Sequence, residues 1–230
     1  MEKKLNFIKG EILIIDKPLE WTSFDVVHKI RNAIKRKLTV KKIKVGHAGT
    51  LDPLATGVLV ICTGKMTKQI DQFINESKSY DGIIQLGATT PSFDLETPVD
   101  HVFPLKKMSA KEIDSLAKTF LGEQFQEPPL FSAKKVNGIR AYELARKGEN
   151  VKLAPKLINI HEIFLELIND QQLSFKLSCS KGTYIRSIAR DIGERLGVGG
   201  HLIKLRRTKS GSFDLADSIS IENCIKIIEC

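Results

Sequence analysis

Cysteine and long apolar runs are both scarce in this sequence, which has four cysteines among 230 residues. The cysteines form no Cys-x-x-Cys pair and the five histidines are scattered, so the spacing typical of a zinc site is missing. No apolar run approaches the roughly 20 residues that a membrane-spanning helix needs, and the N-terminus lacks the apolar core of a signal peptide. We therefore expect a cytoplasmic protein that binds neither a metal nor a membrane, with Cys62 and Cys179 as buried reduced thiols.

Several nucleotide-binding and hydrolase motifs are missing as well. Gly64-Lys65 is followed by Met66, and position 59 is a leucine where a P-loop needs glycine. The sequence contains no Gly-x-Gly-x-x-Gly and no Gly-x-Ser-x-Gly. These absences exclude a phosphate-binding P-loop, a dinucleotide fingerprint and a nucleophile elbow. A Ser-His-Asp triad in another setting stays open.

Acidic residues are absent from residues 26–51, a stretch that carries eight Lys or Arg and two His. The whole chain has a formal charge of +9 and a pI near 9.3. Such a balance favours a nucleic acid or another polyanion as the partner. The alternative for a charge run alone is an ordinary solvated face.

Residues 46–57, which overlap the end of that stretch, contain one acidic residue, Asp52, among glycines and small residues. Pro53 directly after Asp52 moves the aspartate out of the helical region of backbone conformation. The glycines leave room for a ligand to approach closely. A lone carboxylate beside a basic surface predicts a reaction centre for a polyanion, and the alternative is a tight structural turn.

Strands and helices are mixed along the chain without strict βαβ alternation, which favours an α+β fold. Apolar and β-branched patterns predict strands over residues 12–15, 58–62, 80–86 and 173–179. Helices are predicted after Thr22 or Ser23, from the Ser109–Glu112 capping box to Gly122, over residues 140–147, and from Ile185 to near Gly197. No internal repeat or domain boundary is visible, so we expect a single unit.

Arg186 falls in the first turn of the last of these helices, where a positive charge is unfavourable unless something compensates it. A buried carboxylate would do so, and Asp52 is a candidate. The alternative is a solvated arginine on a helix face. Tyr80, which opens a predicted strand, reads on its own as a half-buried core aromatic.

Residues 46–59 resemble the central motif of the TruB family of bacterial tRNA pseudouridine synthases. Five further blocks fit the family in order and at its spacing, from about Gly10 to Ser212: residues 16–23, 78–87, 128–148, 179–186 and 199–207. Chance could supply one such block but not all of them. The resemblance implies the pseudouridine synthase fold, with a mixed, largely antiparallel central sheet flanked by helices and loops.

The resemblance also implies the activity. The chain would isomerise uridine to pseudouridine at position 55 in the T loop of tRNA, without a cofactor or metal. Its partner would be the T-arm of tRNA, with no obligate protein partner and no membrane. Residues 1–230 would form a single catalytic domain, without the C-terminal PUA RNA-binding domain of many relatives.

The family motifs assign a role to matching residues here. Asp52 would be the catalytic aspartate, and Arg186 would form an ion pair that keeps its carboxylate oriented and ionised. Tyr80 would stack on the target uracil, and His47 would pack where the base has left the RNA stack. Asp52 could attack C1′ as a nucleophile or remove the C2′ proton, and both routes stay open.

The remaining assignments concern the walls of the same pocket. Tyr184 would line it and Leu205 would contribute to its apolar floor, while Lys17 and Pro18 would support the active-site loop. The basic residues between positions 29 and 44, with Arg206, Arg207 and Lys209, would bind RNA phosphates.

One departure and two rival functions remain. Residues 90–94, Thr-Pro-Ser-Phe-Asp, stand where relatives usually show Thr-Asp-Thr-x-Asp, so a polar contact near the site is in doubt. One rival is an RNA-binding and refolding module without catalysis. The other is the same chemistry on a different RNA, as in guide-RNA-dependent homologues.

Overall fold

The computed structural model describes residues 5–132, 134–136, 138–149 and 151–230. Contacts between Cα atoms divide the chain into two compact units, which we describe separately. The first unit comprises Met1–Tyr80 with Arg206–Cys230, and the second comprises Asp81–Leu205. The chain passes between the units within two strands, β4 (Lys78–Leu86) and β12 (Gly200–Ser210).

The first unit is built on a strand pair with a strict register. β1 (Ile12–Lys17) runs antiparallel to β3 (Ala55–Thr63), which places Leu13 opposite Ile61, Ile15 opposite Leu59 and Lys17 opposite Gly57. On this sheet β12 is the other neighbour of β3, β2 (Val45–Ala48) also pairs with β3, and β13 (Phe213–Asp214) pairs with the end of β12. The predicted strand at 12–15 is therefore confirmed and extends to Lys17.

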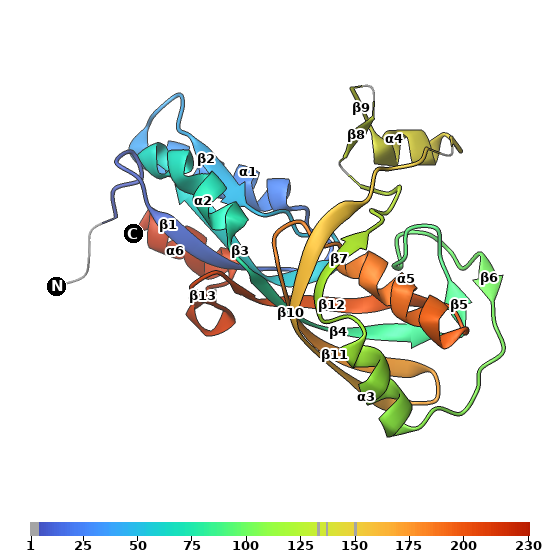
Figure 1. Cartoon of the computed structure of the whole chain (residues 1–230). Coiled ribbons are helices and arrows are strands. Elements are labelled where there is room, and N and C mark those ends of the chain that lie inside the picture. The colour runs from blue at the N-terminus through green and yellow to red at the C-terminus, as the bar shows by residue number, and fades with distance from the viewer. Residues whose placement is uncertain (1–4, 133, 137, 150) are drawn as a thin grey trace. The chain divides into compact units, whose positions relative to one another are not determined.

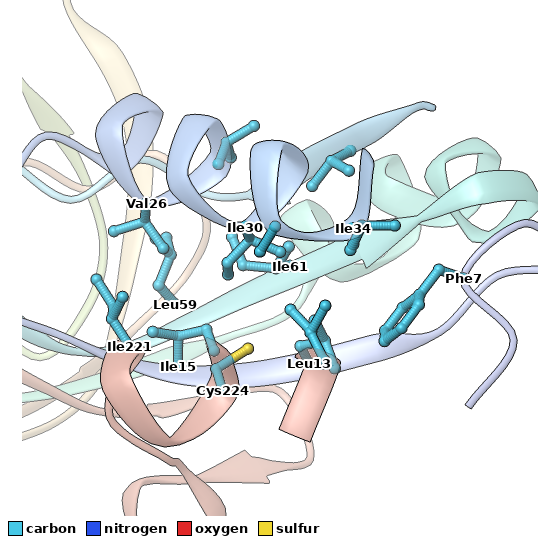
Figure 2. Close-up of a cluster of buried hydrophobic side chains, with 14 residues drawn as sticks. Phe7, Leu13, Ile15, Val26, Ile30, Ile34, Leu59, Ile61, Ile221 and Cys224 are labelled. Carbon is cyan, nitrogen blue, oxygen red and sulfur yellow. The ribbon is translucent and has the colours of Figure 1, made fainter. Parts of the chain in front are cut away.

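Alternation along β1 and β3 buries both faces of this pair. One face packs against α1 (Ser23–Leu38) and α6 (Ile221–Glu229), and Figure 2 shows Val26, Ile30 and Ile34 reaching from α1 toward Leu59 and Ile61. The other face, with Val58, Val60 and Cys62, packs against η1 (Gly64–Gln69) and α2 (Ile70–Asn75). Burial on both sides fixes the register, because a shift by one residue would exchange the two faces.

Helix α1 begins where its sequence signals place it. Thr22 is the N-cap, its hydroxyl accepts from the N–H of Asp25, and the Asp25 carboxylate accepts from the N–H of Thr22. This reciprocal capping box satisfies two donors that the helix itself leaves unpaired. The predicted stripe of Val26, Val27 and Ile30 is buried.

In the second unit the strand order is β12-β4-β11-β10-β7, and the two pairs that β10 makes are antiparallel. β10 (Lys156–Asn169) pairs with β11 (Gln172–Cys179) on one side and with β7 (Gly122–Gln126) on the other. Figure 1 labels α3 (Ala110–Lys118), which packs on β10, and α5 (Ile185–Leu196). Two short hairpins complete the unit: β5 (Ala88–Thr89) with β6 (His101–Val102), and β8 (Lys135–Val136) with β9 (Ile139–Arg140), which leads into α4 (Ala141–Arg146).

The predicted α+β class is confirmed, and one element boundary is wrong. The helix expected to run to Gly122 ends at Lys118, with Thr119 as its C-cap. Gly122 instead opens β7 in a left-handed conformation, with φ of 88°. Phe120 is buried in the turn between the two elements, whereas Leu121 is 48% exposed.

Two sequence-based expectations concern burial and apolar length. Cys62 and Cys179 are both buried, as predicted. Within the part of the chain that the structure describes, no helix is long and apolar enough to cross a membrane.

Candidate active site

Asp52 lies in the short connection between β2 and β3 of the first unit, with its side chain partly exposed. Its carbonyl accepts a hydrogen bond from the N–H of Ala55 at 3.0 Å, which closes a tight turn. The preceding residue, Leu51, is buried, and its N–H donates to the Ser23 hydroxyl at 2.9 Å while its carbonyl accepts from it at 3.1 Å. The backbone on both sides of the carboxylate is therefore fixed.

Lys17 is fully buried beneath this connection. Its ammonium donates to three backbone carbonyls: Pro18, Trp21 and Pro53, the last at 3.2 Å. The Pro53 carbonyl also accepts from the N–H of Glu20 at 2.9 Å. One buried cation thus ties the residue after Asp52 to the end of β1, and the supporting role expected of Lys17 and Pro18 stays a prediction.

Arg207 holds the same connection from β12. Its Nη2 donates to the Gly49 carbonyl at 3.0 Å and its Nε to the Val58 carbonyl at 2.7 Å. Gly57, at φ of 102°, lies so close to the Arg207 backbone that a Cβ there would overlap it. Arg207 is 1% exposed, so its expected role as a phosphate contact is wrong: burial keeps its guanidinium from reaching RNA.

Arg206 is likewise engaged within the protein. Its Nη2 donates to the Asp16 carboxylate at 2.7 Å, and its Nη1 donates to the Thr56 hydroxyl at 3.2 Å. Both groups are about one-third exposed. The side chain ties the end of β1 to the start of β3.

The two buried cations set the electrostatics around Asp52. Burial lowers the pKa of Lys17 to about 8, the Asp52 carboxylate opposes that shift and Arg207 adds to it. Lys17 therefore interacts with the Asp52 charge through space.

His47, in β2, lies opposite Ile61 of β3. Its Nδ1 is buried and has no hydrogen-bond partner among the residues that the structure describes. Burial, with Arg207 nearby, lowers the pKa of this imidazole below its ordinary value. The ring is therefore neutral at physiological pH and presents a flat, weakly polar surface.

Arg186 of the second unit is the second residue of α5 and is buried, with 4% exposure. Its Nε lies 3.5 Å from the Asp94 carboxylate, Nη1 donates to the Ser92 carbonyl at 3.1 Å and Nη2 to the Phe131 carbonyl at 3.0 Å. A positive charge in the first turn of a helix needs a compensating carboxylate, and Asp94 supplies one to Arg186. Asp94 was not among the partners expected for Arg186.

Pro91 stands at the position where the 90–94 segment lacks the acidic residue that relatives usually show, and this position lies outside the buried network. Pro91, which replaces it, is exposed, whereas Ser92 and Asp94 on either side of Phe93 are buried. Backbone and side-chain bonds hold the loop, including the Ser92 hydroxyl to the Asp94 carbonyl at 3.2 Å. The departure from the family pattern therefore leaves the surroundings of Arg186 intact.

The other expected pocket residues are also placed. Tyr184 is the N-cap of α5, and Gln126 both accepts from its N–H at 2.8 Å and donates to its carbonyl at 3.1 Å. Tyr80 and Leu205 are buried, at 9% and 7% exposure. Tyr80 belongs to the first unit, and Tyr184 and Leu205 belong to the second.

The structure thus gathers Asp52, His47 and Lys17 in one unit and Tyr184 and Arg186 in the other. The ion pair between Asp52 and Arg186 stays a prediction. Across the described residues, no group of three or more His, Cys, Asp and Glu side chains could hold a metal ion.

Comparison with known proteins gives matches over nearly the whole chain. The model for "TruB family pseudouridylate synthase (N terminal domain)" matches residues 35–185, and that for "tRNA pseudouridylate synthase B C-terminal domain" matches residues 186–228. The tRNA pseudouridine synthase B of Phocaeicola vulgatus is 55% identical over 95% of this chain and 93% of its own. That of Parabacteroides distasonis is 52% identical over 98% and 96%.

Solved structures agree on the fold. The chain is similar to one in the crystal structure of a Cbf5-Nop10-Gar1 complex, with a TM-score of 0.72 and 28% identity. A chain of the archaeal box H/ACA sRNP Nop10-Cbf5 complex gives a TM-score of 0.66 at 25% identity. Each match covers 96% of this chain and 54% of the other, so the chain spans about half of those proteins. With two family models and relatives above 50% identity along its length, the chain belongs to the TruB family of pseudouridine synthases.

Proposed function

We propose that this protein isomerises the uridine at position 55 in the T loop of tRNA, using Asp52 as its essential group and no cofactor. Membership of the family makes the chain a tRNA pseudouridine synthase, an isomerase that converts uridine to pseudouridine in tRNA. The position in the tRNA, the aspartate and the absence of a cofactor are our proposals.

The observation that carries the proposal is the setting of Asp52. The carboxylate stands partly exposed on a connection whose backbone is held by Lys17 and Arg207. Preorganised surroundings of this kind let a group act without rearranging during the reaction.

The reaction needs a single such group. The bond from N1 of uracil to C1′ breaks, the base turns, C5 bonds to C1′, and the proton from C5 leaves as N1 regains one. Electrons and atoms balance within one nucleotide. Asp52 attacks C1′ in one route and removes the C2′ proton in the other. Uridine deuterated at C2′ distinguishes them, because only proton removal gives a primary isotope effect.

Access to C1′ requires the uridine to leave the stack, at a cost of a few kcal/mol. Stacking of the base on Tyr80 would offset roughly 1–3 kcal/mol of it. The neutral ring of His47 is suited to fill the space that the base leaves, because it carries no charge that burial would penalise.

The test uses an unmodified tRNA transcript incubated with wild-type protein, Asp52→Asn and Asp71→Asn. Asp71 is an exposed residue of α2, so this control changes the net charge equally. Pseudouridine is mapped by carbodiimide-blocked reverse transcription. We expect a stop at the T-loop uridine with wild type and Asp71→Asn, and none with Asp52→Asn.

Binding of the same transcript completes the test. Asp52→Asn should bind with affinity close to wild type, because the carboxylate acts on the base after docking. Tight binding by wild type without any stop would favour the non-catalytic RNA-binding module instead. A stop at another uridine, or one that needs an added guide RNA, would overturn the choice of substrate.

A further inference from the structure

We propose that Lys134, Lys156 and Lys181 of the second unit form a binding site for one phosphate group of the RNA. The proposal rests on the proposed function, since it takes RNA as the substrate. Lys156 is the first residue of β10, Lys181 lies in the turn between β11 and α5, and Lys134 immediately precedes β8. Three segments distant in the sequence thus contribute one cation each.

Backbone contacts bring two of these segments together. The Asn159 carbonyl accepts from the N–H of Ser180 at 2.8 Å, and the Ser180 hydroxyl accepts from the N–H of Asn159 at 2.8 Å. The turn that contains Lys181 is therefore fastened to the beginning of β10. Beyond it, the Lys156 ammonium lies directly over Gly182, whose φ is 73° and where a Cβ would overlap the Lys156 Nζ.

Lys134 reaches the same place from the other side. Its Nζ donates to the Ala154 carbonyl at 3.0 Å, two residues before Lys156. This bond occupies one of the three donors of an ammonium group. The lysine is therefore held beside β10.

The cluster of Lys134, Lys156 and Lys181 is unusual because its positive charges repel one another. The pKa of Lys156 is lowered, first by partial burial and then by the positive charges of Lys134 and Lys181. Both charged groups that act on Lys156 are thus cations. Lysines are usually solvated and separated, so a convergent set is suited to an anion that would relieve the repulsion.

The start of α5 adds to the positive potential. The N-cap, Tyr184, makes no side-chain capping bond, and the first turn contains no acidic residue. Helix N-termini carry a partial positive charge that favours phosphate groups. Gly182 leaves the turn without a side chain, which keeps the approach to Lys156 and Lys181 open.

The same chemistry would recognise an RNA phosphodiester or free inorganic phosphate, and we infer the phosphodiester. The chain belongs to a family of enzymes that act on tRNA. A lysine bound to a backbone phosphate also contributes to affinity in a characteristic, salt-dependent way.

The experiment measures equilibrium binding of a T-arm hairpin at several salt concentrations for wild type, Lys156→Gln, Lys156→Arg and Lys176→Gln. Lys176 is an exposed lysine of β11 and serves as the matched control. We expect Lys156→Gln to reduce the slope of log K against log salt by about 0.7–0.9 and the affinity several-fold. Lys156→Arg should keep the slope, and Lys176→Gln should match wild type.

Two further arms identify the ligand. Hairpins that carry one neutral methylphosphonate linkage at a time should reveal a position at which wild type loses affinity and Lys156→Gln loses none. Inorganic phosphate, compared with chloride at equal ionic strength, should not displace the hairpin more strongly from wild type than from Lys156→Gln. The opposite pattern would assign the site to free phosphate and overturn the proposal.

An unchanged slope in Lys156→Gln, in a protein with wild-type thermal unfolding, would also overturn the proposal. These readouts are independent of catalysis. A protein that binds the hairpin through the lysine site but leaves the uridine unmodified would therefore contradict the proposed function alone.

Discussion

Buried cations in this protein act on backbone carbonyls as well as on carboxylates. Lys17 donates to three carbonyls around the Asp52 connection, Arg207 to two, and Lys78, which is 5% exposed, to the carbonyls of Phe73, Ile74 and Glu76. A buried charge persists only when its donors are satisfied. Each of these residues therefore fixes a turn of the main chain.

Asp94→Asn tests the buried partner of Arg186. Both side chains are nearly inaccessible, so Asp94→Asn removes a negative charge beside a buried guanidinium. We expect a loss of about 3 kcal/mol in the free energy of unfolding, measured by urea denaturation. Asp114→Asn, which breaks the exposed pair with Lys118, should lose less than about 0.5 kcal/mol. Equal losses in the two variants would contradict the assignment.

The pKa of Lys17 predicts a pH dependence of stability. This pKa falls from 10.5 to about 8 on folding, so between these values the unfolded chain retains a proton that the folded chain has released. The free energy of unfolding therefore receives a positive contribution as pH rises from about 8 to 10.5. Urea denaturation at both ends of this window should show wild type gaining stability relative to Lys17→Met.

A direct titration of Lys17 in the wild-type protein tests the same pKa even if Lys17→Met fails to fold. Nuclear magnetic resonance of the Lys17 side chain in the wild-type protein should give a midpoint near 8. A midpoint at the ordinary value of 10.5 would show that burial leaves this ammonium unperturbed.

At the scale of elements, local signals predicted the helix starts. Thr22 and Ser109 both form reciprocal capping boxes, with Asp25 and Glu112 as their partners. Such bonds join residues three apart, so the sequence carries them completely. The predicted end of α3 was wrong because Phe120 is buried in the turn after the helix and not on the apolar face of the helix. Apolar spacing alone does not distinguish these two settings.

The residues of the candidate site also fall into two groups: those indicated by local motifs and those whose contacts only the folded chain creates. Asp52 and Lys17 stood out from their local motifs, and the structure adds the bonds that fix them. The contact of Arg186 with Asp94 could not be predicted, because it joins residues 92 positions apart. The position of Arg186 in the first turn called for a compensating carboxylate, and the sequence offered Asp52 as the candidate.

Removing a cap tests the element scale. Thr22→Ala should lower the free energy of unfolding by about 1 kcal/mol, because the N–H of Asp25 loses its acceptor. Thr22→Ser keeps the hydroxyl and should stay close to wild type. Urea denaturation of the three proteins provides the comparison, and similar losses in both variants would point to the lost methyl group instead.

At the scale of the whole molecule, the net charge of +9 overstates the charge available to RNA. Arg207 and Lys17 count toward that charge although both are fully buried. Composition alone could not separate these structural cations from those that face solvent. We therefore expect the basic residues that face solvent between positions 29 and 44, together with the lysine site, to make a larger share of the phosphate contacts than composition suggests.

Thiol reactivity tests the packing of the molecule as a whole. Burial raises the pKa of Cys62 and of Cys224 to about 11, Cys179 is buried, and Cys230 is exposed. At pH 8 a disulfide reagent such as Ellman's should therefore titrate one thiol rapidly in the native protein and four after denaturation. Replacing Cys230 with serine should remove the rapid phase, and its persistence would show that a buried cysteine opens.

The main-chain hold on the Asp52 connection has a consequence for how this protein tolerates sequence change. Lys17 and Arg207 recognise carbonyl groups, which every amino acid possesses. The connection is thus robust at Thr50 and Leu54, whose side chains these cations do not bond, and fragile at the two cations themselves. A saturation library scored for pseudouridine should accept many residues at the former positions and almost none at the latter.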